Sequence, residues 1–433
     1  MPERNLAEWL TLLEARHPAE IDLGLARVAA VWSSIKQQRL EQNCAISLPT
    51  VITVAGTNGK GSCLASMQAI MLAHGYRVGL FTSPHFLHYN ERIAVQGQPV
   101  DDPTIVRAFD EIEVARGDTS LTYFEFGALA ALLVFVDAGL DLMLLEVGLG
   151  GRLDAINIID ADVAVVTSIA LDHQAWLGDT RELIAVEKLG IARPLKPLVI
   201  AEADAPAGFA QMIAATGTEA FVIGQDFTLS PETNGFSLSL GLKTLTAEPQ
   251  CFRGLPSSGL LPINKAAALQ ALSCAGFTLN GDKVISALDG LTLTGRQQPL
   301  SIDDRSVILD VAHNPAAAKA LAAALKPISG RYLAVASVLN DKDWLGIVEP
   351  LSEIFADWRI AEISASERAT KAQTLHEVLY NAGLSSRLFE SVEEAFQSAL
   401  KAATKDDVIV VFGSFHTVSA VLNMQRESDG CIQ

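Results

Sequence analysis

The sequence predicts an α/β protein in two parts, of which the first is organised around a phosphate-binding loop. An apolar, β-branched run at residues 51–54 leads into the glycine-rich turn 55–62, and a helix over residues 63–74 follows. A second apolar strand at 77–82 comes after this helix, which is the β-α-β order of a parallel sheet. Alternating strands and helices after residue 306 predict a second, smaller α/β unit.

The turn 56–62, Gly-Thr-Asn-Gly-Lys-Gly-Ser, has the composition of a phosphate cradle. Glycines let backbone N–H groups close on an anion, and the positive end of the following helix dipole attracts it. Lys60 supplies a point charge for the outer phosphates. The general P-loop pattern has a hydroxyl directly after the lysine, whereas this chain has Gly61 there and Ser62 one place later. The alternative is a glycine turn with an exposed lysine.

Composition limits the class of protein. The chain has 433 residues, of which 49% are hydrophobic, so it can bury a large core in two or three domains. Its net charge of −18 argues against nucleic acid or an anionic membrane surface as the main partner. The N-terminus lacks a basic segment followed by an apolar stretch. Reduced thiols, and hence a cytoplasmic protein, are expected because no CxxC or metal spacing relates the cysteines at 44, 63, 251, 274 and 431.

The most apolar region, residues 126–149, is predicted to belong to the core. Asp137, Gly139 and Asp141 divide it into a helix and a strand, and each is too short to span a bilayer. No membrane partner is therefore expected.

Apolar periodicity predicts the other elements of both parts. The first part is expected to contain strands at 142–146 and 163–168 and helices at 6–13, 26–40, 106–115 and 126–138. The second part is expected to contain a helix at 314–325 that begins with Asn-Pro, and strands at 307–311, 332–337 and 408–412. The segment 288–299, rich in Gly, Thr and Gln, is the expected hinge.

Polar residues follow three of the predicted strands, at Ser83, at Glu146 and at Asp172-His173. Because ligands bind at the carboxyl ends of parallel strands, these residues are expected to share one edge of the sheet with the phosphate loop. A hydroxyl, a carboxylate and an imidazole there could hold Mg²⁺ beside a nucleotide, although imidazole is an unusual magnesium ligand. The alternative for each residue is a helix cap, a turn former or a hydrogen-bonded surface group.

Seven motifs resemble those of the bacterial folylpolyglutamate synthases, especially the bifunctional dihydrofolate synthase/folylpolyglutamate synthases. They cover nearly the whole chain and are GTNGKGS (56–62), TSPH (82–85), LEVGLGGRLDA (145–155), ALDH (170–173), AVEKLGI (185–191), DVAHNP (310–315) and VFGSFHTV (411–418). The family is one of Mur-ligase-like, ATP-dependent amide ligases. The resemblance implies a P-loop ATPase and pteroate-binding domain with a parallel sheet over residues 1–292, and a C-terminal Rossmann-like glutamate ligase domain over residues 297–433.

The resemblance also implies which residues form the active site. Mg²⁺ is expected on Ser83, Glu146, His173 and Lys188, the last as a carbamate, and Lys60, Lys188 and His313 are the expected catalytic residues. ATP is expected to contact Asn58, Gly59, Lys60, Gly61, Ser62, Asn264, Arg296 and Asp310. Glutamate is expected near His313 and Ser414, and the pterin substrate against Asp22, Leu23, Gly24, Leu25, Thr122, Tyr123, Phe124, Glu125, Leu153, Asp154 and Ala155.

Two of these assignments have simpler alternatives. Without the resemblance, Lys188 would be interpreted as an ordinary lysine on a helix surface. Arg296 and Asp310 could simply form an ion pair. The chain also departs from the family's usual sequence at Ala26, Ile156 and Leu189, and Ile156 lacks the threonine hydroxyl expected beside the pteroate segment.

The implied activity is ATP-dependent addition of L-glutamate to 7,8-dihydropteroate and to reduced folates, through an acyl phosphate, by a cytoplasmic monomer. Three alternatives remain: a monofunctional folylpolyglutamate synthase, a Mur-type peptidoglycan ligase, and a catalytically silent nucleotide-binding regulator. A Mur-type ligase would carry a further domain before the phosphate loop, whereas only 55 residues precede Gly56 here. A silent regulator would need the phosphate loop but not the metal-ligand set.

Overall fold

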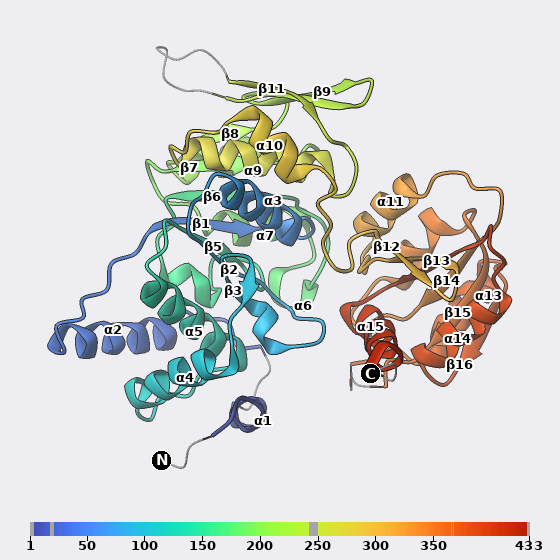
Figure 1. Ribbon diagram of the computed structural model, residues 1–433, viewed down its shortest axis with the longest axis horizontal. Helices are drawn as coiled ribbons and strands as arrows, with labels where there is room; N and C mark the ends of the chain where they lie inside the picture. Colours follow the sequence, from blue (N-terminus) through green and yellow to red (C-terminus); the bar gives the residue numbers. More distant parts are fainter. Residues whose placement is uncertain (1–3, 18–20, 242–249, 365, 367, 431–433) are drawn as a thin grey trace. The chain divides into compact units, whose positions relative to one another are not determined.

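The computed structural model describes residues 4–17, 21–241, 250–364, 366 and 368–430. The chain forms two compact units, unit 1 (Met1–Leu291) and unit 2 (Thr292–Gln433), which are drawn in Figure 1. The helices of unit 1 are α1 (Leu6–Arg16), α2 (Ala26–Glu41), α3 (Lys60–Ala73), α4 (Asp102–Arg116), α5 (Tyr123–Ala138), α6 (Gln174–Leu177), α7 (Arg181–Leu189), α8 (Phe209–Ala215), α9 (Pro262–Cys274) and α10 (Gly281–Leu288).

Unit 1 is built on an eight-stranded sheet in the order β4-β3-β2-β5-β1-β6-β7-β8. The strands from β2 to β8 in this order run parallel, whereas β3 and β4 are antiparallel additions at one edge. The strands are β1 (Thr50–Ala55), β2 (Val78–Phe81), β3 (Ile93–Val95), β4 (Gln98–Pro99), β5 (Leu142–Glu146), β6 (Val163–Val166), β7 (Pro197–Ile200) and β8 (Glu219–Val222). β1 lies between β5 and β6 and runs parallel to both. The loop after β1 therefore starts at the same edge of the sheet as the loops after β5 and β6.

Alternate residues of the central strands enter two different cores, because successive side chains of a strand point to opposite faces. Met143 and Leu145 of β5 pack with α1, α2, α4 and α5, where the rings of Trp9, Phe109 and Phe126 meet. Leu142 and Leu144 of β5 pack instead with α3, α9 and α10. A three-stranded antiparallel sheet covers that second core in Figure 1, and its strands are β9 (Thr228–Glu232), β10 (Gly235–Ser239) and β11 (Cys251–Leu255).

The predicted α/β class is confirmed, and β5 has the predicted bounds. The helices α1 and α2 begin at the predicted residues 6 and 26. The helices α3, α4 and α5 begin three or four residues earlier than predicted, because the predictions started at apolar residues rather than at the caps. α5 begins at Tyr123 because Thr122 and Glu125 form a capping box, and α4 begins at Asp102 because the Asp101 side chain accepts the Thr104 N–H. α3 begins at Lys60, which makes this lysine the first helical residue after the glycine turn.

The apolar region 126–149 forms parts of α5 and β5 in the buried core, as predicted. Among the described residues, no helix is long and apolar enough to cross a membrane. The cysteines at positions 44, 63, 251 and 274 form no disulfide with one another, and Cys431 lies outside the described residues. Within the expected hinge, 288–299, Leu288 ends α10 and Gln298 begins β12, so residues 289–297 connect the two elements.

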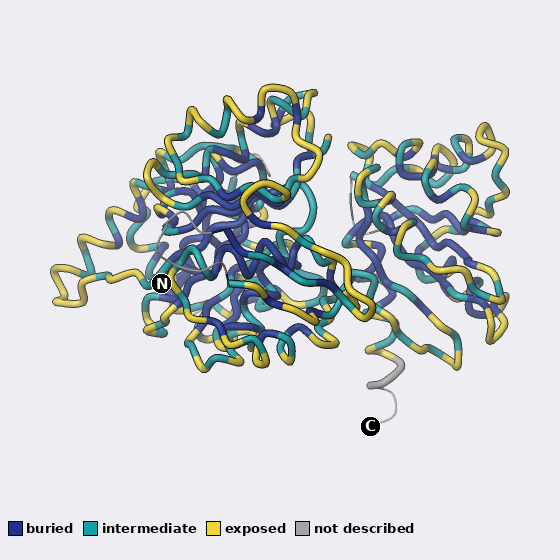
Figure 2. Tube along the Cα trace, turned by 90° about the horizontal axis from the view of Figure 1, so that it is seen from above, coloured by how far each residue is buried: buried dark blue, intermediate teal, exposed yellow. Residues whose placement is uncertain are grey.

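Unit 2 contains a six-stranded sheet in the order β12-β13-β17-β14-β15-β16, in which only the edge strand β12 is antiparallel. Its strands are β12 (Gln298–Ile302), β13 (Arg305–Leu309), β14 (Tyr332–Ala336), β15 (Phe355–Ala361), β16 (Ser386–Phe389) and β17 (Val408–Phe412), and its helices are α11 (Pro315–Ala324), α12 (Trp344–Val348), α13 (Ala372–Asn381), α14 (Val392–Ala402) and α15 (Phe415–Gly430). Figure 2 shows that the buried parts of the chain lie in the interior of each unit and that the exposed parts surround them. Short 3₁₀ turns are η1 (Tyr89–Arg92), η2 (Ala155–Ile158) and η3 (Glu349–Leu351).

Arg359 of β15 is a fully buried charge in unit 2. Its Nη1 lies 3.1 Å from Oδ2 of Asp357, and its Nε donates to Oγ of Ser398 on α14 at 3.4 Å. Within the described residues, neither terminal nitrogen makes a well-aligned hydrogen bond. Burial lowers the pKa of this guanidinium, which means that the folded chain pays a desolvation cost to keep it charged.

We expect Arg359→Met to leave the free energy of unfolding unchanged or to raise it by about 1 kcal/mol, because an apolar side chain of similar size removes the desolvation cost. Asp357 keeps an ion pair with Arg387 in this variant. Urea unfolding measures the effect. Arg331→Met is the contrasting variant, since it removes the ion-pair partner of the buried Asp407 and should lower the unfolding free energy. A clear loss of stability in Arg359→Met would show that its ion pair outweighs its desolvation.

Candidate active site

The phosphate loop of unit 1 requires glycine at two positions. Gly59 has φ +89°, and a Cβ there would lie 2.5 Å from Oδ1 of Asn264. A Cβ on Gly56 would lie 1.9 Å from Oγ1 of Thr167. Asn264, on α9, is buried against the loop, so the fold brings this predicted ATP contact to residues about 200 positions earlier in the chain. The Lys60 ammonium donates to the Gly56 carbonyl at 3.0 Å, which holds it over the turn.

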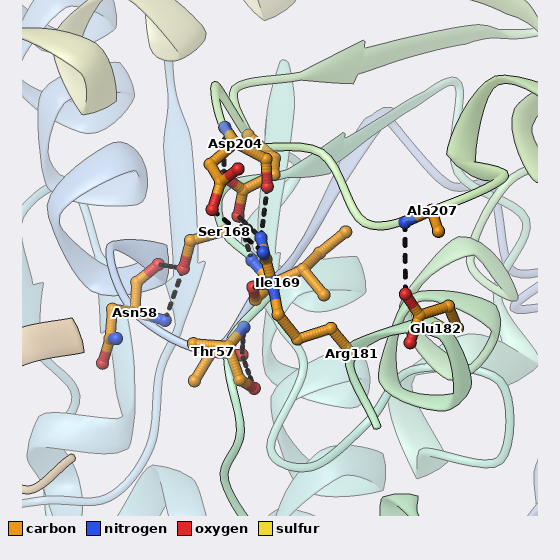
Figure 3. Close-up of polar contacts among 10 residues, drawn as sticks. Thr57, Asn58, Ser168, Ile169, Arg181, Glu182, Asp204 and Ala207 are labelled. Atoms are coloured by element: carbon orange, nitrogen blue, oxygen red, sulfur yellow. Dashed lines mark hydrogen bonds and ion pairs between the residues drawn. The ribbon is translucent and has the colours of Figure 1, made fainter. Parts of the chain in front are cut away.

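Hydrogen bonds join this loop to the segment that follows β6, as Figure 3 shows. The Thr57 hydroxyl donates to the Ala170 carbonyl at 3.1 Å and accepts from the Ala170 N–H at 3.0 Å. The Asn58 N–H donates to Oγ of Ser168 at 2.8 Å, and that hydroxyl donates to the Asn58 carbonyl at 3.0 Å. The loop and residues 168–170 are therefore held as one piece.

Glu146 ends β5 and is buried. Its Oε2 accepts hydrogen bonds from the Thr82 hydroxyl and, at 3.3 Å, from the Ser83 N–H. Among the described residues, both of these hydrogen bonds go to Oε2, and Oε1 accepts none. Thr82 thus orients this carboxylate, a role that the sequence analysis missed although the residue stands directly before Ser83.

The predicted metal ligands come from the carboxyl ends of three strands of the parallel sheet. Ser83 follows β2, Glu146 ends β5, and His173 lies beyond β6 in a left-handed conformation (φ +50°) directly before α6. A carboxylate oriented through one oxygen, a hydroxyl and an imidazole offer the oxygen and nitrogen donors that suit a small divalent cation. These donors fit Mg²⁺ or Mn²⁺.

Lys188 lies in the last turn of α7 and is 3% exposed. The interpretation as an ordinary surface lysine is therefore wrong. Burial and then the positive charge of Lys60 lower the pKa of its amine to about 7, although Asp172 opposes the shift. The fold thus places the phosphate-loop lysine, Lys188 and Asp172 within electrostatic reach of one another, and the amine is largely uncharged above neutral pH.

The three segments predicted to bind the pterin meet in unit 1. Glu125 pairs with Nε of Arg27 at 2.9 Å, and Nη1 of Arg27 pairs with Asp22 at 2.5 Å, so residues 22–27 are tied to the start of α5. Phe124 packs on Phe81 with ring centroids 5.8 Å apart. Glu125 is engaged in the capping box and this ion pair, and the sequence pattern Thr-x-x-Glu could have revealed that structural role.

Asp154 organises the third segment. It is buried, and its two carboxylate oxygens accept the N–H groups of Leu149 and Ile156 at 3.0 Å each. Burial raises its pKa to about 6 against the opposing effect of these backbone bonds. A Cβ on Gly148 would lie 2.6 Å from Cζ of Phe124 and 3.3 Å from Oδ2 of Asp154, so this glycine lets the loop close on the aromatic ring.

Four predicted residues lie in unit 2, where β13 and β17 are parallel neighbours. Asp310 follows β13, and its carboxylate accepts the N–H groups of Gln297 at 2.9 Å and Ala312 at 2.8 Å. Burial raises its pKa, and the charge of Arg296 opposes that shift. The Arg296 guanidinium lies 5.2 Å from the ring centroid of Phe415.

His313 and Ser414 each form a hydrogen bond with nearby backbone. Nδ1 of His313 lies 2.7 Å from the Val311 carbonyl, which assigns the ring proton to Nδ1 and leaves Nε2 as an acceptor. Ser414 is buried, its Oγ accepts the Thr417 N–H at 3.0 Å, and it therefore caps α15.

Comparisons with known proteins agree with this geometry. A family model described as the Mur ligase, glutamate ligase domain matches residues 295–415. The dihydrofolate synthase/folylpolyglutamate synthase of Escherichia coli (strain K12) is 42% identical over 429 residues, which are 98% of this chain and 97% of that protein. The solved structure of E. coli FolC in complex with DHPP and ADP aligns with a TM-score of 0.91 at 40% identity, over 99% of this chain and 100% of that chain.

A second solved structure bears on the metal and the nucleotide. It is a bifunctional folylpolyglutamate synthase/dihydrofolate synthase with Mn, AMPPNP and L-glutamate bound, and it aligns with a TM-score of 0.87 at 41% identity over 98% of each chain. These relatives span nearly the whole sequence at well above 30% identity. The chain therefore belongs to the dihydrofolate synthase/folylpolyglutamate synthase family of Mur-ligase-like proteins.

Proposed function

We propose that this chain is an ATP-dependent ligase that adds L-glutamate to 7,8-dihydropteroate and to reduced folates. The observation that carries the proposal is the joint presence, in unit 1, of a phosphate loop, an oriented carboxylate at Glu146 and a buried amine at Lys188. The likeness to bifunctional relatives over the whole chain supports the two substrates. We assign ATP binding and the pterin site to a domain of residues 1–292, and glutamate ligation to a domain of residues 297–433.

The chemistry needs activation because a carboxylate is a poor electrophile toward an amine. The substrate carboxylate first attacks the γ-phosphorus of ATP, which gives an acyl phosphate and ADP. The glutamate amine then attacks the acyl carbon, the amide bond forms, and inorganic phosphate leaves. The turn 56–62 cradles the phosphates through its backbone N–H groups, and Lys60 supplies positive charge where negative charge shifts during transfer.

Ser83, Glu146 and His173 would hold the divalent cation. A bound Mg²⁺ would neutralise charge on the transferred phosphoryl group. Thr82 and the Ser83 N–H fix one oxygen of Glu146, so that the carboxylate keeps a defined direction. The remaining proposed nucleotide contacts are Asn58, Gly59, Gly61, Ser62 and Asn264 in unit 1, and Arg296 and Asp310 in unit 2.

Lys188 is proposed to act as a carbamate. Its neutral amine adds to CO₂, a nitrogen–carbon bond forms, and one proton is released, which converts a neutral group into an anion. A pKa of about 7 supports this step, because the neutral amine is the reactive form and is abundant near neutral pH. The resulting carboxylate would be a further ligand for a divalent cation.

His313 is proposed to receive the proton that glutamate must lose before its amine can attack. The proton on Nδ1 is directed to the Val311 carbonyl, so Nε2 keeps the lone pair that a base requires. Ser414 is proposed to lie beside the same substrate, with its hydroxyl held in place by the cap of α15.

Product analysis tests the proposed function. The purified chain is incubated with ATP, Mg²⁺ and glutamate, and with either 7,8-dihydropteroate or tetrahydrofolate, and products are identified by mass. We expect one glutamate to be added to each acceptor, with ADP and phosphate formed in equal amounts. Product from tetrahydrofolate alone would identify a monofunctional folylpolyglutamate synthase. Nucleotide binding without product from either acceptor would favour the silent regulator, and product only from a UDP-sugar acceptor would identify a Mur-type ligase.

Phe124→Ala is expected to raise the KM for dihydropteroate about fivefold, because the loss of ring stacking costs on the order of 1 kcal/mol. Steady-state kinetics with varied dihydropteroate measures this effect, and the KM for ATP should stay unchanged. Tyr380→Ala is the control, since this aromatic side chain in unit 2 is 73% exposed. An unchanged KM in Phe124→Ala would remove the ring from the proposed pterin site.

We also propose that the protein is a cytoplasmic monomer that binds no nucleic acid. The net charge of −18 supports the last part, because nucleic acids attract basic surfaces. Size-exclusion chromatography with light scattering checks the oligomeric state, for which the expected mass is 46.1 kDa.

A further inference from the structure

We propose that Arg181 and Glu202 are positioning residues that hold the chain segment 168–173 in register with the phosphate loop and thereby set the affinity for the divalent cation. The inference rests on the proposed function in one respect, namely that His173 is a metal ligand. Neither residue belongs to the motifs from which the active site was predicted.

The two side chains bind both backbone polar groups of a single residue, Ile169. Oε2 of Glu202 accepts the Ile169 N–H at 2.6 Å, and Nε of Arg181 donates to the Ile169 carbonyl at 2.8 Å. The two charged groups also form an ion pair, with 3.7 Å between Nη2 of Arg181 and Oε2 of Glu202. Figure 3 shows Arg181 beside Ile169, on the opposite side from Asn58.

The residues before and after Ile169 bond to the phosphate loop instead of to Arg181 and Glu202. Ser168 and Ala170 bond to Asn58 and Thr57 of the phosphate loop, as described above. Three consecutive residues are thus fixed alternately by the loop and by the Arg181–Glu202 pair. His173 is four residues beyond Ile169, so at most about 14 Å of chain separates a shift at Ile169 from the backbone of His173.

The pair is itself anchored to two further elements. Arg181 is the first residue of α7, whose last turn carries Lys188, and Glu202 lies two residues beyond β7. Nη1 of Arg181 pairs with Oδ2 of Asp204 at 2.9 Å, and Oε1 of Glu202 accepts the Asp204 N–H at 2.8 Å. One ion pair therefore connects the helix of Lys188, the segment of His173 and, through that segment, the phosphate loop.

The geometry explains why an arginine stands here. Its planar fork presents separate N–H groups to the Ile169 carbonyl, to the Asp204 carboxylate and to the Asp204 carbonyl, which a lysine ammonium on a flexible stem does not reproduce. The Glu202 side chain is 11% exposed, so its bonds are partly shielded from water. The side chains that support metal ligands from behind commonly change metal affinity 10- to 100-fold when removed.

The test measures Mn²⁺ affinity by electron paramagnetic resonance on the full-length protein in the presence of AMPPNP. Arg181→Met is expected to weaken Mn²⁺ binding about tenfold. Arg181→Lys should recover part of that loss, and Glu202→Gln, which keeps an acceptor oxygen for Ile169, should lose less than Arg181→Met. Arg39→Met is the matched control, because Arg39 makes two ion pairs in the same unit, with Glu111 and Asp137 on α4 and α5.

A double substitution separates positioning from general stability. If Arg181 acts through His173, Arg181→Met should cause no further loss of Mn²⁺ affinity in a His173→Asn background. An equal loss in that background, or normal Mn²⁺ affinity in Arg181→Met while His173→Asn binds weakly, would overturn the inference. Normal Mn²⁺ affinity in His173→Asn would instead overturn the proposed metal site. Glu202→Gln provides the same comparison if Arg181→Met does not fold.

Discussion

Glu146→Gln is expected to reduce kcat/KM by on the order of 10²- to 10³-fold with an intact fold. The substitution removes one negative charge from the carboxyl edge of the sheet and leaves the side-chain volume nearly unchanged. The Thr82 hydroxyl can still donate to the amide oxygen, so the local hydrogen bond survives. The lost charge weakens the hold on a divalent cation, and kinetics over a range of Mg²⁺ concentrations should show a raised Mg²⁺ requirement.

Glu182→Gln is the control for this loss. Glu182 also accepts a backbone N–H, from Ala207 at 3.1 Å, but it lies at the start of α7 rather than at a strand end of the sheet. The control should retain wild-type turnover and Mg²⁺ dependence. Normal ATP-coupled turnover of Glu146→Gln at ordinary Mg²⁺ concentrations would end the assignment of Glu146 as a metal ligand.

Lys188→Ala is expected to lose activity on a similar scale, on the order of 10²- to 10³-fold, and to regain part of it with added formate or acetate. The proposed function of Lys188 depends on the anion that its carbamate carries, so a small carboxylate in the vacated space can replace the charge. Lys196→Ala is the control, because Lys196 pairs with Asp162 at the surface. Mass analysis that finds only a free amine in active, bicarbonate-equilibrated protein would refute the carbamate.

Stability measurements show whether the loss in Lys188 variants comes from unfolding. In CO₂-free buffer the unfolded chain keeps the Lys188 proton up to a pKa near 10.5, whereas the folded chain releases it near 7. The unfolded chain therefore binds more protons in that interval, and the free energy of unfolding should rise with pH between about 7 and 10.5. Lys188→Met should lack this rise and should be at least as stable as the wild type at pH 7.

Much of the fold could be predicted from local patterns because the central strands are apolar and bounded by polar residues. β5 was predicted to the residue, since Asp141 and Glu146 mark its limits. The starts of α3, α4 and α5 were predicted less well. Thr122 and Asp101 extend α5 and α4 by bonding to backbone N–H groups, an effect that apolar periodicity does not register.

The site was predicted less completely because some of its features depend on tertiary contacts. The sequence does not distinguish an exposed lysine from a buried one. Lys188 is 3% exposed, and its pKa is lowered. Arg181 and Glu202 belong to no motif, because they bond to the backbone N–H and carbonyl of Ile169. Almost any residue at position 169 would offer the same two groups. The role of Thr82 in orienting Glu146 depends on a contact between two strand ends that are far apart in the sequence.

The order of strands in unit 1 has a consequence for synthesis on the ribosome. β1 pairs with β5 and β6, whose residues come roughly 90 to 110 positions later, and Thr57 bonds to Ala170. A nascent chain that ends before residue 170 therefore lacks the partners that hold its glycine turn in place, even though the turn itself has long emerged. Nucleotide affinity should arise late and abruptly as the chain lengthens, so short translation products would not compete with the finished protein for ATP.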